Sequence, residues 1–311
     1  MQKVIVIVGP TAVGKSALAV RLARKFNGEV ISADSRQVYK RLDIGTGKIT
    51  KKEMRGVPHH LLDVADPKEQ FSVSEYQKAA RKKLEEIFRR GNLPIVVGGT
   101  GLYIQAIVND VAFPEVPPNL KLRKRFEKKS TRELFEILQK LDARRAKTID
   151  PHNPRRLIRA IEIARVLGKV PNLQPTTDPS NFVRTKFSRA GNRQQDTLWI
   201  GLMQPPEVLK KKIAICLFAR IRKYLLEEVK KLHRKGVSWK RMEELGLQYR
   251  YISRHLRGLI ARKEMIAKLQ TEIWHYAKRQ MVWFKRNKAI HWFNPKEARK
   301  IEDVVSAFLR R

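Results

Sequence analysis

The chain has 311 residues, of which 42% are hydrophobic, enough for a packed core, so a wholly disordered protein is excluded. It carries 67 lysines and arginines against 30 acidic residues, which gives a formal net charge of +37. Such an excess repels itself unless an anion shares the surface, so it indicates nucleic-acid binding, with a Lys-rich solubilising surface as the simpler alternative.

Redox and targeting features favour the cytoplasm. The single cysteine, Cys216, cannot form an internal disulfide, and no Cys/His cluster has the spacing of a zinc site. The first residues lack the length and the small-residue cleavage site of a signal peptide, and no run of 18 apolar residues could span a membrane. We therefore expect a cytoplasmic protein, and we predict that it is a monomer.

The N-terminal part alternates predicted strands and helices. A β-branched run at residues 3–8 is typical of a strand buried on both faces of a parallel sheet, and helical spacing follows at 15–26. Further strands are predicted at 28–34 and 92–97, on either side of a helix over 72–91 that stops at a glycine. This alternation predicts an α/β fold with a parallel sheet flanked by helices.

Composition shifts at residues 113–130, where prolines mark a linker. The patterns that follow are helical over 131–149 and 151–169, and we predict that residues 114–190 form an inserted basic helical domain. Its polar, turn-rich segment at 170–195 is expected to be mobile.

After the insertion, residues 196–205 look like a strand that returns to the sheet, and the chain is helical from about residue 206 to a last helix. The predicted catalytic core therefore consists of residues 1–113 and 191–311.

The stretch GPTAVGKS matches the phosphate-loop pattern G-x-x-x-x-G-K-[ST], between a strand and a helix as this motif requires. Backbone N–H groups of such a loop and the helix N-terminus favour phosphate oxygens. Lys15 would add a positive charge, and Ser16 would hold a metal such as Mg²⁺. The predicted phosphate-binding residues are Gly9, Pro10, Thr11, Ala12, Val13, Gly14, Lys15 and Ser16.

Two further predicted strands are followed by polar residues that could take part in catalysis. P-loop NTPases need a metal-holding Asp after a neighbouring strand, but the strand at 92–97 runs into Gly98 and Gly99. Asp34 is the acid that ends another strand, and Thr100 follows the glycines with a hydroxyl that can donate to a phosphate or accept from an amine. Asp34 alone would also fit a helix N-cap or an Asx turn; beside a phosphate loop we predict that it belongs to the site.

Six segments stand in a family order: GPTAVGKS, SADSRQVYKRLDIGTGK, PHHLLDV, VGGTGLYIQAI, NPRRLIRAIEI and YAKRQMVWFK, from Gly9 to about Lys285. In this order they closely resemble the tRNA dimethylallyltransferase (tRNA isopentenyltransferase) family. DSRQVY and AKRQ are far more specific than the phosphate loop alone. The resemblance covers nearly the whole chain and implies a P-loop NTPase-like core.

The resemblance implies transfer of a dimethylallyl group from dimethylallyl diphosphate to N6 of the adenosine immediately 3′ of the anticodon, in tRNAs that read codons beginning with U. The phosphate loop would then hold a prenyl diphosphate instead of ATP, which agrees with the missing strand-end Asp. In this chemistry Asp34 would accept a proton from the amine, Thr100 would orient the leaving group or the amine, and Lys15, an arginine and Mg²⁺ on Ser16 would stabilise the departing diphosphate.

The family's tRNA contacts map onto several polar and basic segments. In this chain they are Asp34, Ser35, Arg36, Gln37, Thr100, Arg123 and the run Arg155, Arg156, Leu157, Ile158 and Arg159. Lys278 and Arg279 are also expected to face tRNA phosphate, whereas the aromatic residues among which they lie have the spacing of a core helix. His59 and His60 are expected to close a turn near the site.

Two segments depart from the family pattern. The stretch LFARIRKYLLEEVKKL is shorter than its family counterpart, so the diphosphate-binding arginine could be Arg220, which we favour, or Arg222. The usual LGY reads LGL at residues 245–247, which puts the contacts of the segment 243–248 in doubt.

Three alternatives remain at this point. An adenylate isopentenyltransferase would prenylate a free nucleotide, but a basic inserted domain exceeds the needs of that substrate. A P-loop small-molecule kinase would require the strand-end metal Asp. A nucleotide-binding RNA-binding protein without catalysis is opposed by Asp34 beside an intact Lys15.

Overall fold

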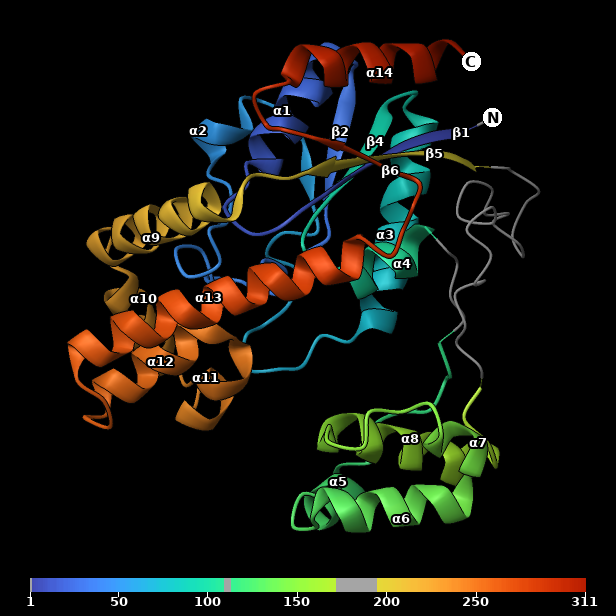
Figure 1. Cartoon of the computed structure of the whole chain (residues 1–311), viewed down its shortest axis with the longest axis vertical. Helices are drawn as coiled ribbons and strands as arrows, with labels where there is room; N and C mark the ends of the chain where they lie inside the picture. The colour runs from blue at the N-terminus through green and yellow to red at the C-terminus, as the bar shows by residue number, and fades with distance from the viewer. Residues whose placement is uncertain (1, 109–112, 172–194) are drawn as a thin grey trace. The chain divides into compact units, whose positions relative to one another are not determined.

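The computed structural model describes residues 2–108, 113–171 and 195–311 (Figure 1). The chain divides into two compact units: Met1–Asp110 together with Thr176–Arg311, and Val111–Pro175. Most of the segment at 170–195 that was expected to be mobile lies outside the described residues. Within the described part of the chain, no helix has the length and apolar character needed to cross a membrane.

The first unit is built on a six-stranded sheet in which every pairing is parallel, as expected from the alternating pattern. The strand order is β3-β2-β4-β1-β5-β6. The strands are β1 (Gln2–Val8), β2 (Gly28–Ser32), β3 (His59–His60), β4 (Leu93–Val97), β5 (Gln195–Leu202) and β6 (Ile290–Phe293). The short edge strands β3 and β6 were not predicted, because two to four residues show no readable periodicity.

The helices of the first unit connect these strands and cover the sheet. The N-terminal half contains α1 (Lys15–Lys25), α2 (Lys51–Met54), α3 (Val73–Arg89) and α4 (Gly101–Val108). The C-terminal half contains α9 (Pro206–Arg222), α10 (Leu225–Arg234), α11 (Trp239–Leu245), α12 (Leu247–Leu256), α13 (Arg262–Phe284) and α14 (Ala298–Arg310).

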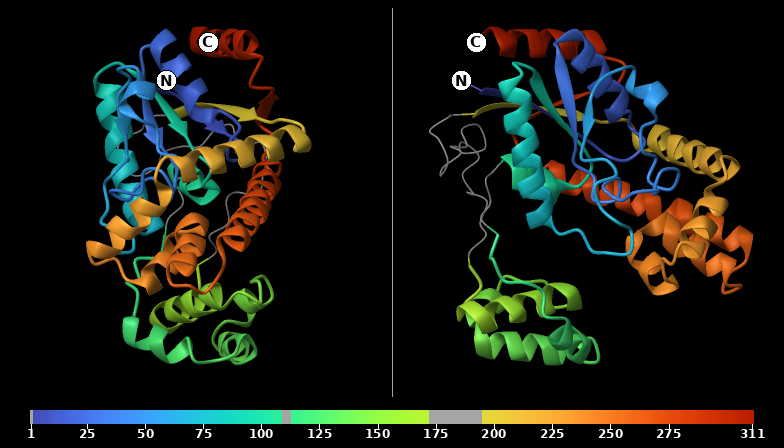
Figure 2. Two further views of the ribbon diagram at one scale, coloured as in Figure 1. Left: turned by 90° about the vertical axis from the view of Figure 1, so that its left-hand side faces the viewer. Right: turned by 180° about the vertical axis from the view of Figure 1, so that it is seen from behind.

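The direction of each crossover decides which face a helix covers. The chain moves from β1 to β2 towards one edge of the sheet and from β3 to β4 towards the other. Because parallel crossovers are right-handed, α1 and α3 must lie on opposite faces. The C-terminal helix α14 joins α1 on its face (Figure 2), where Arg21 and Lys25 of α1 both bond to the Glu302 carboxylate.

Local signals explain where α3 begins and ends. Its N-cap Ser72 accepts a hydrogen bond from the backbone N–H of Glu75, and the Glu75 carboxylate accepts one from the N–H of Ser72, which is a complete capping box. The chain leaves the helix through Gly91 at a φ of 73°, in the left-handed region that glycine adopts at no steric cost. Its buried face includes Tyr76, which donates to the backbone oxygen of Ser32.

The second unit is a small bundle with its own core. It contains α5 (Leu120–Phe126), α6 (Thr131–Leu141), α7 (Ala143–Ala146) and α8 (Pro154–Leu167). Its buried side chains include Phe126, Leu134, Leu138, Leu157 and Ile161. The prediction of a proline linker over 113–130 was incomplete, because its basic C-terminal half forms α5 behind an Asn119 N-cap.

A buried acid joins three elements at the edge of the sheet. Glu29 of β2 accepts hydrogen bonds from Arg90 at the end of α3 (2.8 and 2.9 Å) and from Asn92 (2.8 Å), and its Oε2 lies 2.6 Å from Nε2 of His60 in β3. Burial on its own would raise the pKa of Glu29, but the hydrogen bonds from Arg90, Asn92 and His60 outweigh it and lower the pKa to about 2. The ionised carboxylate is therefore part of the folded state.

Glu29→Gln is expected to lower the free energy of unfolding at pH 7 by roughly 2–3 kcal/mol, because it leaves a buried cluster of donors with a poorer acceptor. Since folding depresses this pKa from 4.5 to about 2, the stabilisation is complete above pH 4.5 and is lost as the pH falls towards 2. Urea unfolding across this range should show that the free energies of unfolding of the wild type and of Glu29→Gln become equal at acid pH. Glu207→Gln, which removes an exposed pair with Lys210, should change stability by less than about 0.5 kcal/mol.

Candidate active site

The predicted site residues of the first unit meet where β1, β2 and β4 end. The backbone N–H of Ala33, after β2, donates to Val97 of β4, and the N–H of Gly98 donates to Ile7 of β1. A side chain at Gly98 would overlap the backbone oxygen of Ala33, so only glycine lets the two strand ends approach this closely. Parallel pairing thus brings three loops to one edge, where open α/β sheets build their sites.

A cavity at this edge is lined by the residues that the sequence singled out. The phosphate loop contributes Thr11, Ala12, Gly14, Lys15 and Ser16, and other strand ends contribute Asp34, Gln37, Gly98 and Gly99. The Nζ of Lys15 donates to the backbone oxygens of Gly9 (3.0 Å) and Pro10 (2.7 Å), which holds the ammonium over the loop. Burial lowers the pKa of Lys15 to about 8, although the charge of Asp34 opposes the shift. An anion in this cavity would restore the charged form.

Asp34 uses one carboxylate oxygen for local structure. Its Oδ1 accepts hydrogen bonds from the backbone N–H groups of Arg36 (2.8 Å) and Gln37 (3.4 Å), which is an Asx-type turn. Thr100 Oγ1 accepts from the N–H of Ser35 (3.0 Å), so the loops after β2 and β4 are tied together. Among the residues that the structure describes, no hydrogen bond involves Oδ2 of Asp34, which leaves it able to accept a proton.

Helix α13 supplies two side chains that the sequence analysis did not assign to the site: Gln280, and Tyr276, which belongs to the aromatic set interpreted as core. Gln280 accepts a hydrogen bond from the N–H of Thr11 and donates to the backbone oxygen of Gly99, both at 2.9 Å, so it links the phosphate loop to the glycine turn. Tyr276 also lines the cavity, and burial raises the pKa of its hydroxyl. Gln280 stands in the quoted AKRQ motif, so the motif itself was the available signal.

Helix α9 brings Arg220 to the same cavity, whereas Arg222 is exposed. Arg220 Nη1 donates to the backbone oxygen of Gly45 at 3.3 Å. Burial lowers the pKa of Arg220, and nearby Cys216, Tyr249 and Asp34 act in the opposite direction. The shortened stretch turns from α9 into α10 through Lys223 and Tyr224 and still leaves an arginine facing the phosphate loop.

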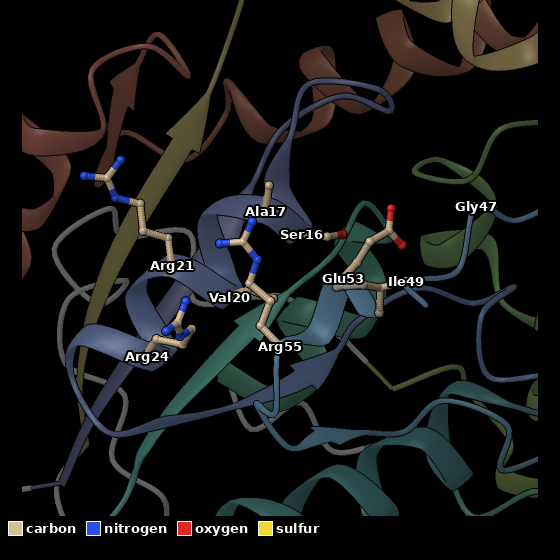
Figure 3. A pocket seen from close by; sticks show the side chains of 9 residues that line it. All are labelled: Ser16, Ala17, Val20, Arg21, Arg24, Gly47, Ile49, Glu53 and Arg55. Carbon is tan, nitrogen blue, oxygen red and sulfur yellow. The ribbon is translucent and has the colours of Figure 1, made fainter. Parts of the chain in front are cut away.

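A second pocket adjoins the cavity on the outer side of α1 (Figure 3). Ser16, Ile49 and Glu53 lie on one side of the view, and Arg21, Arg24 and Arg55 on the other. Among the described residues, no group of three or more His, Cys, Asp or Glu side chains could hold a metal ion. The Ser16 hydroxyl, which the sequence analysis assigned to Mg²⁺, is exposed and lines both pockets.

The candidate tRNA-contact residues of the second unit divide into three kinds. Arg155 and Arg156 are exposed at the start of α8. Arg123 and Arg159 bind the buried Glu162, the former through two hydrogen bonds of 2.7 and 2.8 Å, and Arg159 also donates to the backbone oxygen of Val116.

Leu157 and Ile158 are buried in the core of the second unit. Their assignment as tRNA contacts was therefore wrong for their side chains, because the helical period turns them inward while Arg155 and Arg156 point to solvent.

The remaining predicted contacts of the first unit lie near the cavity or on α13. Ser35, Arg36 and Gln37 are half-buried beside Asp34, and Lys278 and Arg279 are exposed. Among the interleaved aromatics, Phe284 is buried. The Nζ of Lys278 lies over the Trp274 ring, 5.9 Å from its centroid. His59 and His60 form β3, and His59 lines the cavity with a pKa that burial lowers.

A family model described as IPP transferase matches residues 37–287. This chain belongs to the IPP transferase family. The matched range contains the glycine turn and the α13 residues of the cavity. It begins after the phosphate loop and Asp34.

Curated relatives resemble this IPP transferase along its whole length. A tRNA dimethylallyltransferase from Anoxybacillus flavithermus is 39% identical over 311 residues, covering 99% of this chain and 95% of the relative. One from Caldanaerobacter subterraneus is also 39% identical, over 97% of this chain and 95% of the relative.

Solved structures agree with the fold. The full-length tRNA isopentenylpyrophosphate transferase from Bacillus halodurans is 34% identical, with a TM-score of 0.72 over 100% of this chain and 97% of its own. A eukaryotic dimethylallyltransferase acting on tRNA is 30% identical, with a TM-score of 0.76 over 94% of this chain and 74% of its own.

The affinity of this IPP transferase for inorganic diphosphate is expected to fall by about tenfold for each pH unit above 8, because Lys15 loses its charge there. Isothermal titration calorimetry between pH 7 and pH 9.5 measures the slope. Lys15→Gln should bind diphosphate weakly at every pH and should lack the part of the pH dependence of affinity that is due to Lys15. Lys25→Gln, at the C-terminal end of α1, should keep the wild-type profile, and a wild-type profile in Lys15→Gln would contradict this role.

Proposed function

We propose that the protein transfers a dimethylallyl group from dimethylallyl diphosphate to N6 of the adenosine immediately 3′ of the anticodon, in tRNAs that read codons beginning with U, and releases diphosphate. The observation that carries this proposal is the convergence of Lys15, Asp34 and Arg220 at one cavity, with Thr100 bonded to the loop that carries Asp34. Family membership and the printed names of the relatives agree with it.

The chain's residues divide the reaction between donor and acceptor. The N6 lone pair forms a bond to C1 of the dimethylallyl group, and the bond from C1 to the bridging oxygen breaks, so the electron pair leaves on diphosphate. Lys15, the loop amides and Arg220 stabilise that charge in a site partly shielded from water. The proton of N6 passes to Asp34, which we place within reach of the amine as the general base. Thr100 orients Asp34's loop through Ser35.

The acceptor adenine is stacked in the anticodon loop, so it must be flipped out to reach Asp34. Ser35, Arg36 and Gln37 lie beside Asp34 and are proposed to contact the displaced nucleotide. Lys278 and Arg279 are exposed on α13, which also carries the cavity residue Tyr276, so we propose that they bind tRNA phosphate. Electrostatic attraction from a chain of charge +37 accounts for approach of a polyanion.

We propose Mg²⁺ as the cofactor, held by the Ser16 hydroxyl and by the diphosphate. When bound, Mg²⁺ neutralises charge on the leaving diphosphate. The Ser16 side chain is exposed at the start of α1, where it lines both pockets. We also propose that the protein acts as a cytoplasmic monomer.

Purified protein with dimethylallyl diphosphate, Mg²⁺ and a tRNA that reads a codon beginning with U is expected to form prenylated adenosine, measured by mass spectrometry of nucleosides. Asp34→Asn should lower the rate by about 10²–10⁴-fold because it removes the base but keeps the Oδ1 turn. Affinity for tRNA should change by less than about threefold, since a neutral isostere preserves the loop.

Loss of tRNA binding in parallel with activity in Asp34→Asn would contradict the base role. Transfer to AMP in place of tRNA would favour the free-nucleotide alternative. Turnover of ATP without prenylation would favour a kinase, and tRNA binding without either reaction would favour a non-catalytic RNA-binding protein. Chelation of Mg²⁺ by EDTA should suppress transfer.

Arg155→Ala and Arg156→Ala should each weaken tRNA binding and reduce the slope of log affinity against log salt by about 1, because each exposed guanidinium releases one counterion from phosphate. Fluorescence anisotropy with a labelled anticodon stem-loop over a range of salt concentrations measures the slope. Arg132→Ala is a control in the same unit, since that exposed residue already pairs with Glu136. Unchanged slopes in both variants would exclude the start of α8 from the interface.

A further inference from the structure

The loop at residues 43–48, with the sequence DIGTGK, forms one wall of the phosphate cavity. Thr46 and Gly47 line the cavity opposite Lys15 and Ser16. The loop is a tight turn in which the N–H of Gly47 donates to Ile44 and the N–H of Lys48 donates to Asp43. The loop lies outside the helices and strands. Its own Lys48 bonds to Tyr39 and Asp63, and its backbone N–H groups are anchored by a side chain from another part of the chain.

Glu228 of α10 provides that anchor. Its Oε2 accepts hydrogen bonds from the backbone N–H groups of Asp43 (3.0 Å) and Ile44 (2.7 Å), and its Oε1 accepts one from Gly45 (3.0 Å). Three successive N–H groups that converge on one anion form a nest, a strong backbone anion site. The Glu228 carboxylate occupies this nest in the structure.

Tyr249 of α12 completes the anchor. Its hydroxyl donates to Oε1 of Glu228 at 2.8 Å, and its ring is buried, with burial raising the pKa of the hydroxyl. A Cβ at Gly45 would lie 2.6 Å from this ring, so the ring fits against the loop only because residue 45 is glycine.

The same loop also fixes Arg220. The guanidinium donates to the backbone oxygen of Gly45, and a side chain at Gly47, where φ is 62°, would overlap it. Arg220 and Glu228 stand eight positions apart on the consecutive helices α9 and α10, and they bind opposite sides of the peptide groups around Gly45. A shift of the loop would therefore move the guanidinium relative to Lys15.

We propose that Glu228 and Tyr249 are positioning residues for the diphosphate, which act by holding the 43–48 loop and through it the Arg220 guanidinium over the phosphate loop. This inference rests on the proposed function for the identity of the donor substrate. It goes beyond that function by assigning a role to two side chains that do not touch the substrate.

The test measures binding of inorganic diphosphate by calorimetry, which requires no transfer reaction. Glu228→Gln and Tyr249→Phe should each weaken binding by about tenfold, because a charge-assisted hydrogen bond to the anchor is lost. Glu227→Gln is the matched control: its side chain is a neighbour on α10 and, among the residues that the structure describes, its ion pair is with Lys230 at 2.8 Å, so binding should stay at the wild-type value.

A double-mutant cycle separates positioning from general stability. In the Arg220→Ala background, Glu228→Gln and Tyr249→Phe should change diphosphate affinity by less than about twofold, because the group they position is gone. In transfer assays the same variants should raise the KM for dimethylallyl diphosphate and leave the KM for tRNA unchanged. A structural defect alone would alter both constants.

Wild-type affinity for diphosphate in both single variants, or equal losses in the Arg220 and Arg220→Ala backgrounds, would overturn the inference. Tyr249→Phe keeps the ring packed against Gly45, so it remains informative if Glu228→Gln lowers the yield of folded protein. Absence of prenyl transfer by the wild-type protein would refute the proposed function while the diphosphate measurements still decide the role of Glu228.

Discussion

The parallel pairing of β4 with both β1 and β2 is the constraint on which the site depends. It delivers the phosphate loop, Asp34 and the glycine turn to one edge of the sheet. The pairing is continued beyond the strands by hydrogen bonds of Ala33 and Gly98, and the closeness of these loops is permitted by the missing side chain of Gly98. Lys15, Asp34 and Thr100 take their positions from this edge, whereas Arg220 reaches the cavity from α9 and bonds to the loop at 43–48.

The excess of positive charge gives the few buried acids unusual importance. Glu29, Glu162 and Glu228 each accept several hydrogen bonds, and each joins segments that are distant along the chain. A basic chain can satisfy such carboxylates readily, and an acid with several donors is expensive to remove. Cations such as Arg155, Arg156, Lys278 and Arg279 stay exposed, whereas Lys15 and Arg220 line the cavity. Buried acids thus join segments of the fold, and many bases remain on the surface for a polyanionic partner.

Much of the fold and part of the site could be predicted from sequence. The β-branched run before GPTAVGKS and the alternation after it were enough for the parallel sheet, because buried parallel strands have a continuous apolar pattern. Lys15, Asp34 and Thr100 were identifiable because each follows a strand. Gln280 and Glu228 were not singled out, since their partners are backbone groups about 180–270 positions away, and no local period reports such contacts. Tyr249 was not assigned to the site because its partner is Glu228, 21 positions earlier on another helix. Leu157 and Ile158 were misassigned because a motif names consecutive residues, whereas a helix separates them onto different faces.

The placement of β1 between β4 and β5 has a consequence for the order of folding during synthesis. β1 can pair with β4 once about 100 residues have been made, but β5 follows only after the entire second unit. Until then the other edge of β1 is an open row of backbone donors and acceptors, and such edges invite wrong pairing. The second unit has its own core, so it can fold as a local module in the interval. The partial sheet of β1, β2 and β4 must therefore remain intact with an open edge until β5 has been synthesised. β5 then covers the edge of β1, and α14 binds α1 through Glu302.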